Sequence, residues 1–374
     1  MGLSRRAILS GGMLGAAAMV TSACAFAPAK ASTVKPSASD TQPPVKPVID
    51  GDLVYFNWAD YVDPSIFDGF KKQYGVNIIQ SNFDSMESMV AKMNAGNAYD
   101  LIFPSAKFTQ KLAQAGKLHR IDHSTLTNAD AIFSNYTYFD NPWYDVQSQH
   151  SIPFSMYKTG IGWRRDKLGD LTGSWGDMWN ATAKGRTYVL DDRDEALGMA
   201  ALRLGLDVNT AKADDLSKIV NLLTDLRSDL RAFDSDDYDN LLNGNAWLTQ
   251  AWSGDMTTVI GEAKNPKQYG FEVAKEGSPI NSDCYAIPSS ARHPGTALLF
   301  IDYMLKPENV IKNINYIGYP MPVKGTEDAY ASLVESLPQC VVTVDDLSKD
   351  LVFRNGTVAQ EQARDAAWTD VQAG

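Results

Sequence analysis

Four short segments that supply aromatic rings and carboxylates lie far apart in this sequence. They are Asn57-Trp58-Ala59-Asp60-Tyr61, Asp191-Asp192-Arg193-Asp194-Glu195, Trp252-Ser253-Gly254-Asp255 and Ser282-Asp283-Cys284-Tyr285. A carboxylate neutralises an ammonium group, while the electron-rich face of a ring attracts the cation and covers its methylene neighbours. Both attractions strengthen where water is excluded. Trp and Asp together therefore favour a cationic ligand.

Each of these segments also has a purely structural interpretation. Trp58 could be a core aromatic residue, and Asp255 could cap a helix after a turn. Acidic side chains accept the free amides of a first helical turn and complement the helix dipole. We expect this capping role for one or two of Asp191, Asp192 and Asp194. Segment by segment the two interpretations are about equally good, but four such segments near strand ends favour ligand binding.

Other chemistry has little support in the sequence. None of the four histidines stands in an H-E-x-x-H or C-x-x-C setting, so no metal site is predicted. No G-x-S-x-G elbow and no Gly-rich phosphate-binding loop opens a helix. The sequence therefore predicts no cofactor and offers little basis for an enzyme.

Length and composition point to a globular protein of two lobes. The chain has 374 residues, of which 44% are hydrophobic and 10% aromatic. Its formal net charge is −11. Because phosphate binding needs a basic surface, this charge argues against a nucleic-acid partner.

The amino terminus is typical of an exported bacterial protein. Paired Arg5 and Arg6 precede a Gly/Ala-rich apolar stretch that is too short to span a bilayer, so residues 1–31 are predicted to be a twin-arginine export signal. Two cleavage sites remain open. Residues 20–24 resemble a lipobox that would leave Cys24 lipidated, and residues 29–31 form an A-x-A site that would release a soluble protein. Residues 32–49, rich in Ser and Pro, are expected to be an extended, disordered tether.

Two cysteines remain in the part expected to fold. Cys284 and Cys340 could form one disulfide in an oxidising compartment, or they could be two separate buried thiols. The sequence leaves both alternatives open, because it does not report whether the two residues come within bonding distance.

The rest of the chain alternates between expected strands and helices, which demands a parallel sheet covered on both faces. Expected strands are 53–56, 76–79, 99–103, 159–163, 187–190 and 256–260. Expected helices are 64–74, 86–94, 107–115, 195–204, 213–230, 238–243 and 294–305.

These elements predict an α/β fold of two lobes, each a mostly parallel sheet flanked by helices, with the ligand cleft between the lobes. The first lobe is expected to comprise residues 50–153 plus 284–325, and the second 154–283 plus 326–374. In open sheets of this kind, ligands bind beyond the carboxyl ends of the strands. Trp58, Ser105, Asp192 and Trp252 each lie close to such an end.

Seven segments, taken in order, resemble the spermidine/putrescine-binding proteins of bacterial polyamine ABC importers. They are FNWADY at 56–61, YDLIFPSA at 99–106, SWGDMW at 174–179, LDDRDEA at 190–196, AWSGD at 251–255, DCYAIP at 283–288 and IGYPMP at 317–322. The resemblance implies a two-lobed periplasmic-binding-protein fold and no catalysis. It also implies a monomer, in the periplasm or lipid-anchored outside the cytoplasmic membrane, that passes putrescine or spermidine to a membrane permease.

The resemblance also implies a set of ligand-binding residues. Trp58 and Trp252 would sandwich the alkyl chain, and Tyr61 would add a further wall. The carboxylates that hold amines would be Asp60, Glu195, Asp255 and Asp283, and in some members Asp192. Ser105 and Tyr319 would also line the site.

The sequence departs from the family at three places that could alter selectivity. Lys107 replaces a Tyr or Ser, Asn281 replaces an aromatic residue, and Lys158 lies in a segment that replaces a Trp-containing run. Either the two lysines point to solvent and pair with surface acids, or one occupies the place of a ligand amine and selects a shorter or zwitterionic ligand. We expect the first for Lys158 and leave Lys107 open.

Three rival functions follow from the same residues. A zwitterionic amine or amino acid derivative could bind with Lys107 or Lys158 on its carboxylate. An enzyme acting on an amine could use the same fold, although no cofactor motif supports it. A ligand sensor that docks onto a receptor could use the same pocket with a different partner.

Overall fold

A computed structural model describes residues 43–132 without 84, residues 142–342, residue 346 and residues 351–373. Among these residues, no helix combines the length and the apolar character that crossing a membrane requires. The export signal (1–31), Cys24 and residues 32–42 of the expected tether lie outside the described residues.

The last part of the expected tether, residues 43–49, is attached to the fold at two points. Val45 is buried, and its amide donates a hydrogen bond to the carbonyl of Arg120. The amide of Val48 donates to the carbonyl of Gly295. Val45 therefore packs onto the fold, whereas the side chains of Val48 and Ile49 remain exposed.

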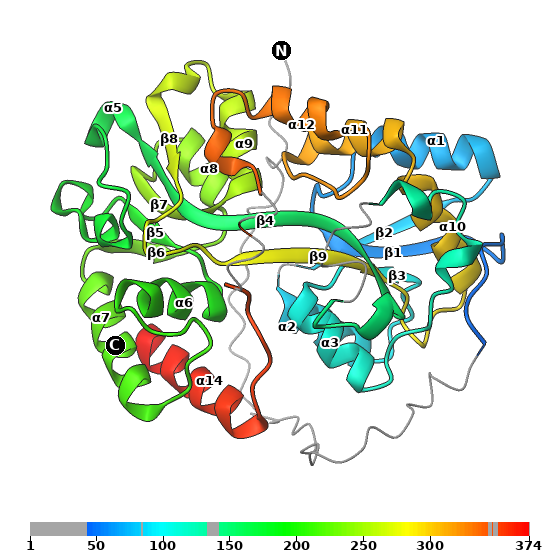
Figure 1. The fold of residues 1–374 in the computed structure, drawn as a ribbon, viewed down its shortest axis with the longest axis horizontal. Coiled ribbons are helices and arrows are strands. Elements are labelled where there is room, and N and C mark those ends of the chain that lie inside the picture. Colours follow the sequence, from blue (N-terminus) through cyan, green and yellow to red (C-terminus); the bar gives the residue numbers. More distant parts are fainter. Residues whose placement is uncertain (1–42, 84, 133–141, 343–345, 347–350, 374) are drawn as a thin grey trace, which may run out of the picture. The chain divides into compact units, whose positions relative to one another are not determined.

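The described chain alternates between strands and helices (Figure 1). The strands are β1 (Leu53–Trp58), β2 (Ile78–Phe83), β3 (Leu101–Ile102), β4 (Ser151–Arg164), β5 (Thr187–Val189), β6 (Leu230–Phe233), β7 (Leu248–Trp252), β8 (Tyr269–Glu272) and β9 (Ile280–Ala286). The α-helices are α1 (Pro64–Tyr74), α2 (Met86–Asn94), α3 (Ala106–Gln114), α5 (Arg165–Leu168), α6 (Arg193–Arg203), α7 (Ala213–Arg227), α8 (Asp237–Leu242), α9 (Ser253–Glu262), α10 (Pro294–Met304), α11 (Pro307–Ile317), α12 (Glu327–Leu333) and α14 (Val358–Ala373).

The strands form one mixed sheet in the order β2-β1-β3-β9-β4-β7-β5-β6, and β8 pairs with β4. Pairing is parallel for β1 with β2 and β3, and for β5 with β6 and β7. It is antiparallel wherever β4 or β9 takes part. The expectation of mostly parallel pairing thus holds toward the two edges and is wrong at the centre.

The long strand β4 explains this difference. Its 14 residues are buried almost throughout, so no exposed residue marks where one partner strand ends and the next begins. Its first part pairs with β9, and residues from Thr159 onward pair with β7 and β8 (Figure 1). The expected strand 159–163 is therefore only the second part of one continuous strand.

Helices with clear capping residues lie where the sequence predicts them. Asp63 accepts a hydrogen bond from the amide of Ser65 at the start of α1, and Gly75 ends that helix with a positive φ of 71°. At the start of α2, the side chain of Ser85 accepts a hydrogen bond from the amide of Ser88. Both helices have the predicted bounds, 64–74 and 86–94.

The expected strand 256–260 is wrong, because these residues belong to helix α9. The β-branched residues in this segment favour a strand locally. In the structure the preceding residues 248–252 form strand β7 instead, and α9 buries Met256, Thr257 and Val259 against the core. Tertiary packing overrides the local preference.

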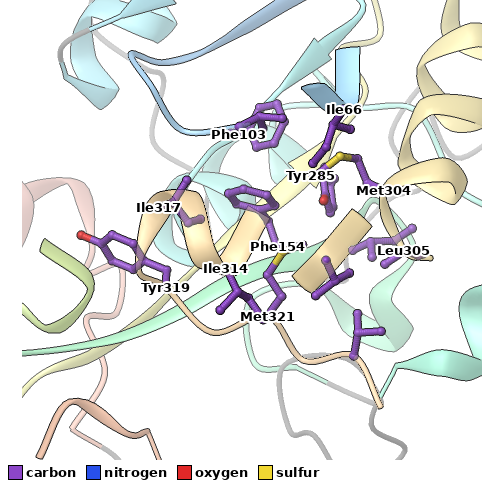
Figure 2. Packing of buried hydrophobic residues seen from close by; sticks show 14 of the residues in the cluster. Ile66, Phe103, Phe154, Tyr285, Met304, Leu305, Ile314, Ile317, Tyr319 and Met321 are labelled. Atoms are coloured by element: carbon purple, nitrogen blue, oxygen red, sulfur yellow. The ribbon is translucent and has the colours of Figure 1, made fainter. Parts of the chain in front are cut away.

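Aromatic packing in the core reaches the residues of the candidate site. Phe154 makes edge contacts with Phe103 and Tyr285 at ring-centroid distances of 5.0 Å. Tyr61 packs on the same Phe154 at 5.1 Å. Figure 2 shows Tyr319 at one side of this cluster, with its hydroxyl directed away from the other labelled side chains. The core therefore fixes the rings of Tyr61 and Tyr319 from one side.

Candidate functional site

Asp283 of β9 is the centre of a buried polar cluster. It is 5% exposed, and its Oδ2 accepts a hydrogen bond from the Tyr61 hydroxyl at 3.0 Å. Its Oδ1 lies 3.5 Å from the hydroxyl of Tyr157. The Tyr61 hydroxyl also lies 2.9 Å from Oγ of Ser155, and Ser105 forms a β-bridge with Asp283. Burial raises the pKa of Asp283 to about 7, although the two tyrosine hydroxyls act in the opposite direction.

Four aromatic rings adjoin this cluster. Tyr319 meets Tyr61 at 5.6 Å and Tyr157 at 5.8 Å, and both pairs are nearly perpendicular. Tyr157 in turn meets Trp252, the last residue of β7, at 6.3 Å. Position 254 must be glycine in this arrangement, because a Cβ there would lie 2.2 Å from the Tyr319 ring. The rings form a continuous wall that starts beside Asp283.

Glu195 lies at the other side of this wall. It is 3% exposed, and its Oε1 accepts a hydrogen bond from the Trp252 indole at 3.1 Å. Its Oε2 is buried without a hydrogen-bond partner among the described residues. Burial, and then the nearby Asp192, raises the pKa of Glu195 to about 8. No Lys, Arg or His in the described part of the chain forms an ion pair with Glu195 or Asp283.

The three aspartates before α6 have different roles. Asp192 is its N-cap, and its Oδ1 accepts the amides of Asp194 at 2.8 Å and Glu195 at 2.9 Å. Asp191 instead contacts Gln372. The prediction that one or two of these acids cap the helix is confirmed for Asp192. Burial, and then Asp194, raises the pKa of Asp192 to about 6.

Lys107 is buried in a network of charged side chains. It is 3% exposed, and its Nζ lies 2.8 Å from Asp194 Oδ2 and 3.3 Å from Glu361 Oε2. Arg193 and Arg364 also pair with Asp194. Although burial acts to raise it, Lys107 and then the two arginines hold the pKa of Asp194 well below its usual range.

Lys158 is also buried, so the expectation that it points to solvent is wrong. It lies in β4, is 6% exposed, and its Nζ is 3.1 Å from Asp346. Neither lysine is a solvated surface residue. Each is neutralised by protein carboxylates, because a buried ammonium needs a charged partner.

Two other predicted residues, Trp58 and Asp60, make no hydrogen bond or ring contact with Asp283 in the described chain. Trp58 packs on Phe83 at 4.7 Å, and its indole nitrogen is buried without a hydrogen-bond partner among the described residues. Asp60 is exposed and has a positive φ of 52°. Asn281 lies opposite Tyr157 in the sheet, and its side chain accepts the amide of Ser282.

Two residues of the cluster were not predicted as site residues. Tyr157 and Ser155 alternate along β4 and face Asp283 because β4 pairs with β9. The sequence shows that Ser155 and Tyr157 are two residues apart, as on one face of a strand. It does not show that this strand pairs with β9, which brings both residues to Asp283.

Cys284 and Cys340 are both free thiols, so the disulfide alternative is wrong. Both are fully buried, and Cys284 Sγ lies 3.5 Å from the Tyr144 hydroxyl. Burial raises the pKa of each thiol to about 12, which keeps both protonated.

Comparisons with known proteins agree with a site for a small solute. A family model described as bacterial extracellular solute-binding protein matches residues 65–339. The spermidine/putrescine-binding periplasmic protein of Escherichia coli (strain K12) is 33% identical over 276 residues, which cover 72% of this chain and 77% of that protein. A putrescine-binding periplasmic protein of the same organism is 28% identical over 342 residues, covering 86% and 91%. A solved structure titled putative spermidine/putrescine ABC transporter from Listeria monocytogenes superposes with a TM-score of 0.79 at 25% identity, covering 86% of this chain and 99% of that one.

Proposed function

This chain belongs to the bacterial extracellular solute-binding proteins, among the spermidine/putrescine-binding periplasmic proteins, and from this premise we propose that it captures a polyamine and delivers it to an ABC permease. Its family binds solutes and does not transform them, so the protein is not an enzyme. It acts as a monomer outside the cytoplasm. Putrescine and spermidine are the proposed ligands, because relatives named for them match most of the chain.

The observation that carries this proposal is the pair of buried carboxyls without a basic partner. Asp283 and Glu195 lie at two sides of the wall that contains Tyr157 and Trp252. Buried carboxylates need a compensating charge. An ammonium at each carboxyl supplies that charge together with hydrogen-bond donors, while the rings cover the methylenes between them. A flexible dication meets both requirements.

A zwitterionic ligand is less well supported. It needs a cationic side chain for its carboxylate, and Lys107 and Lys158 are the predicted candidates. Both ammonium groups already contact protein carboxylates at 2.8 Å and 3.1 Å. A ligand carboxylate would have to compete with these pairs.

A thermal-shift screen followed by calorimetry tests the proposal. Purified protein is titrated with putrescine, spermidine and 4-aminobutyrate. A ligand that binds only the native state raises the melting temperature by mass action. We expect stabilisation by the polyamines and little by 4-aminobutyrate. Binding of 4-aminobutyrate alone would favour the zwitterion, and no response to any amine would contradict the proposed function.

The proposed mechanism is closure of two lobes around the ligand. The lobes are 50–153 plus 284–325, and 154–283 plus 326–374. Tyr61 and Ser105 then belong to the first, Glu195, Trp252 and Asp255 to the second, and Asp283 to the crossing strand β9. Contacts that the ligand makes with the protein only in the closed state supply the free energy that drives closure. Residues 1–31 would direct export, with Cys24 lipidated or removed.

Replacing Trp252 by Ala should weaken putrescine binding by ~1–3 kcal/mol. The change removes a ring face and the indole donor to Glu195. Trp247→Ala is a matched control, because Trp247 directly precedes β7 and lies over Lys167 and Arg186 instead of the site. Calorimetry of both variants, with circular dichroism to verify folding, provides the measurement. Equal affinities for Trp252→Ala and wild type would show that this ring is not part of the site.

Replacing Lys107 by Met should weaken putrescine binding about tenfold. Lys107 lies in the first proposed lobe and pairs with Asp194 and Glu361 of the second, so its ion pairs stabilise the closed state. Without these ion pairs, a larger part of the ligand's binding free energy is needed to close the lobes, so the observed affinity falls. Because two carboxylates neutralise this ammonium, its repulsion of the ligand is a smaller effect.

Lys111→Met is the control for this experiment. Lys111 lies one turn further along α3, its side chain is 40% exposed, and its Nζ is 3.7 Å from the same Glu361. Exposed pairs of this kind contribute little, so its affinity should stay within about twofold of wild type. Tighter polyamine binding by Lys107→Met, with a larger gain for spermidine, would instead show that Lys107 repels the ligand.

A further inference from the structure

Helix α8 begins with a carboxyl group in a fully buried position. Asp237 is 0% exposed. Neither of its carboxyl oxygens accepts a well-formed hydrogen bond from a donor among the described residues. No Lys, Arg or His in that part of the chain forms an ion pair with it. An ionised carboxylate is very unfavourable in such surroundings, so Asp237 is expected to carry a proton.

The group that acts most strongly on Asp237 is another carboxyl. Helix α8 packs against α9 and β7. From α9, the side chain of Asp255 interacts with Asp237, and from the end of β7 so does the backbone of Trp252. Tyr319 interacts with both carboxyls from the segment after α11. The other acid of α9, Glu262, lies at the opposite end of that helix.

Two neighbouring carboxyls in a buried site do not both ionise, because their like charges repel each other in surroundings of low polarity. The more deeply buried one keeps its proton and can donate it in a hydrogen bond to the other. Asp237 is the more deeply buried member of this pair, since Asp255 is only partly buried.

We propose that Asp237 is a positioning residue for Asp255, whose carboxylate binds the ligand. Asp237 stays protonated at neutral pH and donates its O–H to one oxygen of Asp255. The pair then carries a single negative charge, and the second oxygen of Asp255 is oriented toward one ligand ammonium. This inference rests on the proposed function, because it takes Asp255 to be a ligand-binding residue. In support, burial and then Asp255 raise the pKa of Asp237 well above its usual value.

Two substitutions at position 237 test this inference. The amide of Asp237→Asn can donate a hydrogen bond as the protonated acid does, so its Kd for putrescine should stay within about threefold of wild type. Asp237→Ala has no donor and should raise Kd about tenfold or more. Asp236→Asn is the control, because Asp236 is exposed and does not cap α8 through its side chain. If Asn weakens binding as much as Ala does, a charged Asp237 is required and the inference is overturned.

The pH dependence of unfolding gives a second readout that does not need a ligand. A carboxyl whose pKa is raised in the folded state favours folding below its unfolded pKa of about 4, and this contribution is lost as pH rises. Asp237→Asn should therefore melt at a higher temperature than wild type at pH 8, with the difference shrinking toward pH 4.5. A difference that does not change with pH would contradict a proton on Asp237. If wild type binds no polyamine, the proposed function fails, yet this measurement still decides whether Asp237 is protonated.

Discussion

Putrescine should bind at least about 100-fold more tightly at pH 7.5 than at pH 5.5. Mainly because of burial, the pKa values of Glu195 and Asp283 are raised to about 8 and about 7. An ammonium pairs with an ionised carboxylate, so each group must lose its proton when the ligand binds. Below the pKa of each carboxyl, the need to remove its proton weakens binding by up to about tenfold per pH unit. The ligand amines stay charged throughout this range, since alkylammonium groups have pKa values of about 10.

The stability of the ligand-free protein should change in the opposite direction. A carboxyl with a raised pKa in the folded state contributes stability below its unfolded value of about 4, and this contribution is lost as pH rises through 7 and 8. The melting temperature without ligand should therefore fall between pH 5 and pH 8 while affinity rises. Calorimetry and thermal melts across this range measure both. In Glu195→Gln, the pH dependence of Kd should be less steep because one titrating group is missing. An affinity that stays constant from pH 5.5 to 7.5 would contradict these protonation states.

Local signals in the sequence predicted the first helices well. The Asp63-Pro64 start and Gly75 end of α1 specify its bounds through capping and a positive φ, which depend only on neighbouring residues. The family resemblance, not local signals, predicted the carboxyls Glu195 and Asp283 and the rings Tyr61, Trp252 and Tyr319 as site residues. The structure joins these residues through contacts with Tyr157 and with each other.

Features that depend on distant pairing were not predictable in the same way. Tyr157 faces Asp283 only because β4 pairs with β9, and residue types within β4 do not indicate that register. The burial of Lys107 likewise depends on Asp194 and Glu361, which are distant in sequence. A lysine is usually exposed, so the default expectation fails where the fold brings two carboxylates to one ammonium.

Replacing Asp283 by Asn should weaken putrescine binding by ~2–5 kcal/mol at pH 8. The amide keeps the size of the side chain, and its oxygen can still accept the Tyr61 hydroxyl, which Asp283 binds at 3.0 Å. The substitution removes only the negative charge that would pair with the ligand ammonium. Removing one member of a buried charge pair commonly has an effect of this size. Asp122→Asn is the control, because Asp122 caps a short 3-10 turn and contacts Ser124. Calorimetry on folded variants measures the loss, and a similar loss in Asp122→Asn would indicate a general effect on the protein.

The double variant Asp283→Asn/Glu195→Gln tests whether the two carboxyls hold the two ends of one ligand. If each binds a separate ammonium of putrescine, their losses should add to within about 0.5 kcal/mol, as for independent groups. A monoamine such as butylamine can use only one of the two carboxyls at a time, so one single variant should leave its affinity nearly unchanged. If both carboxyls hold the same ammonium, the second substitution should cost much less than the first, and butylamine should respond to both. Because Tyr157 and Trp252 lie between Asp283 and Glu195, we expect the additive result.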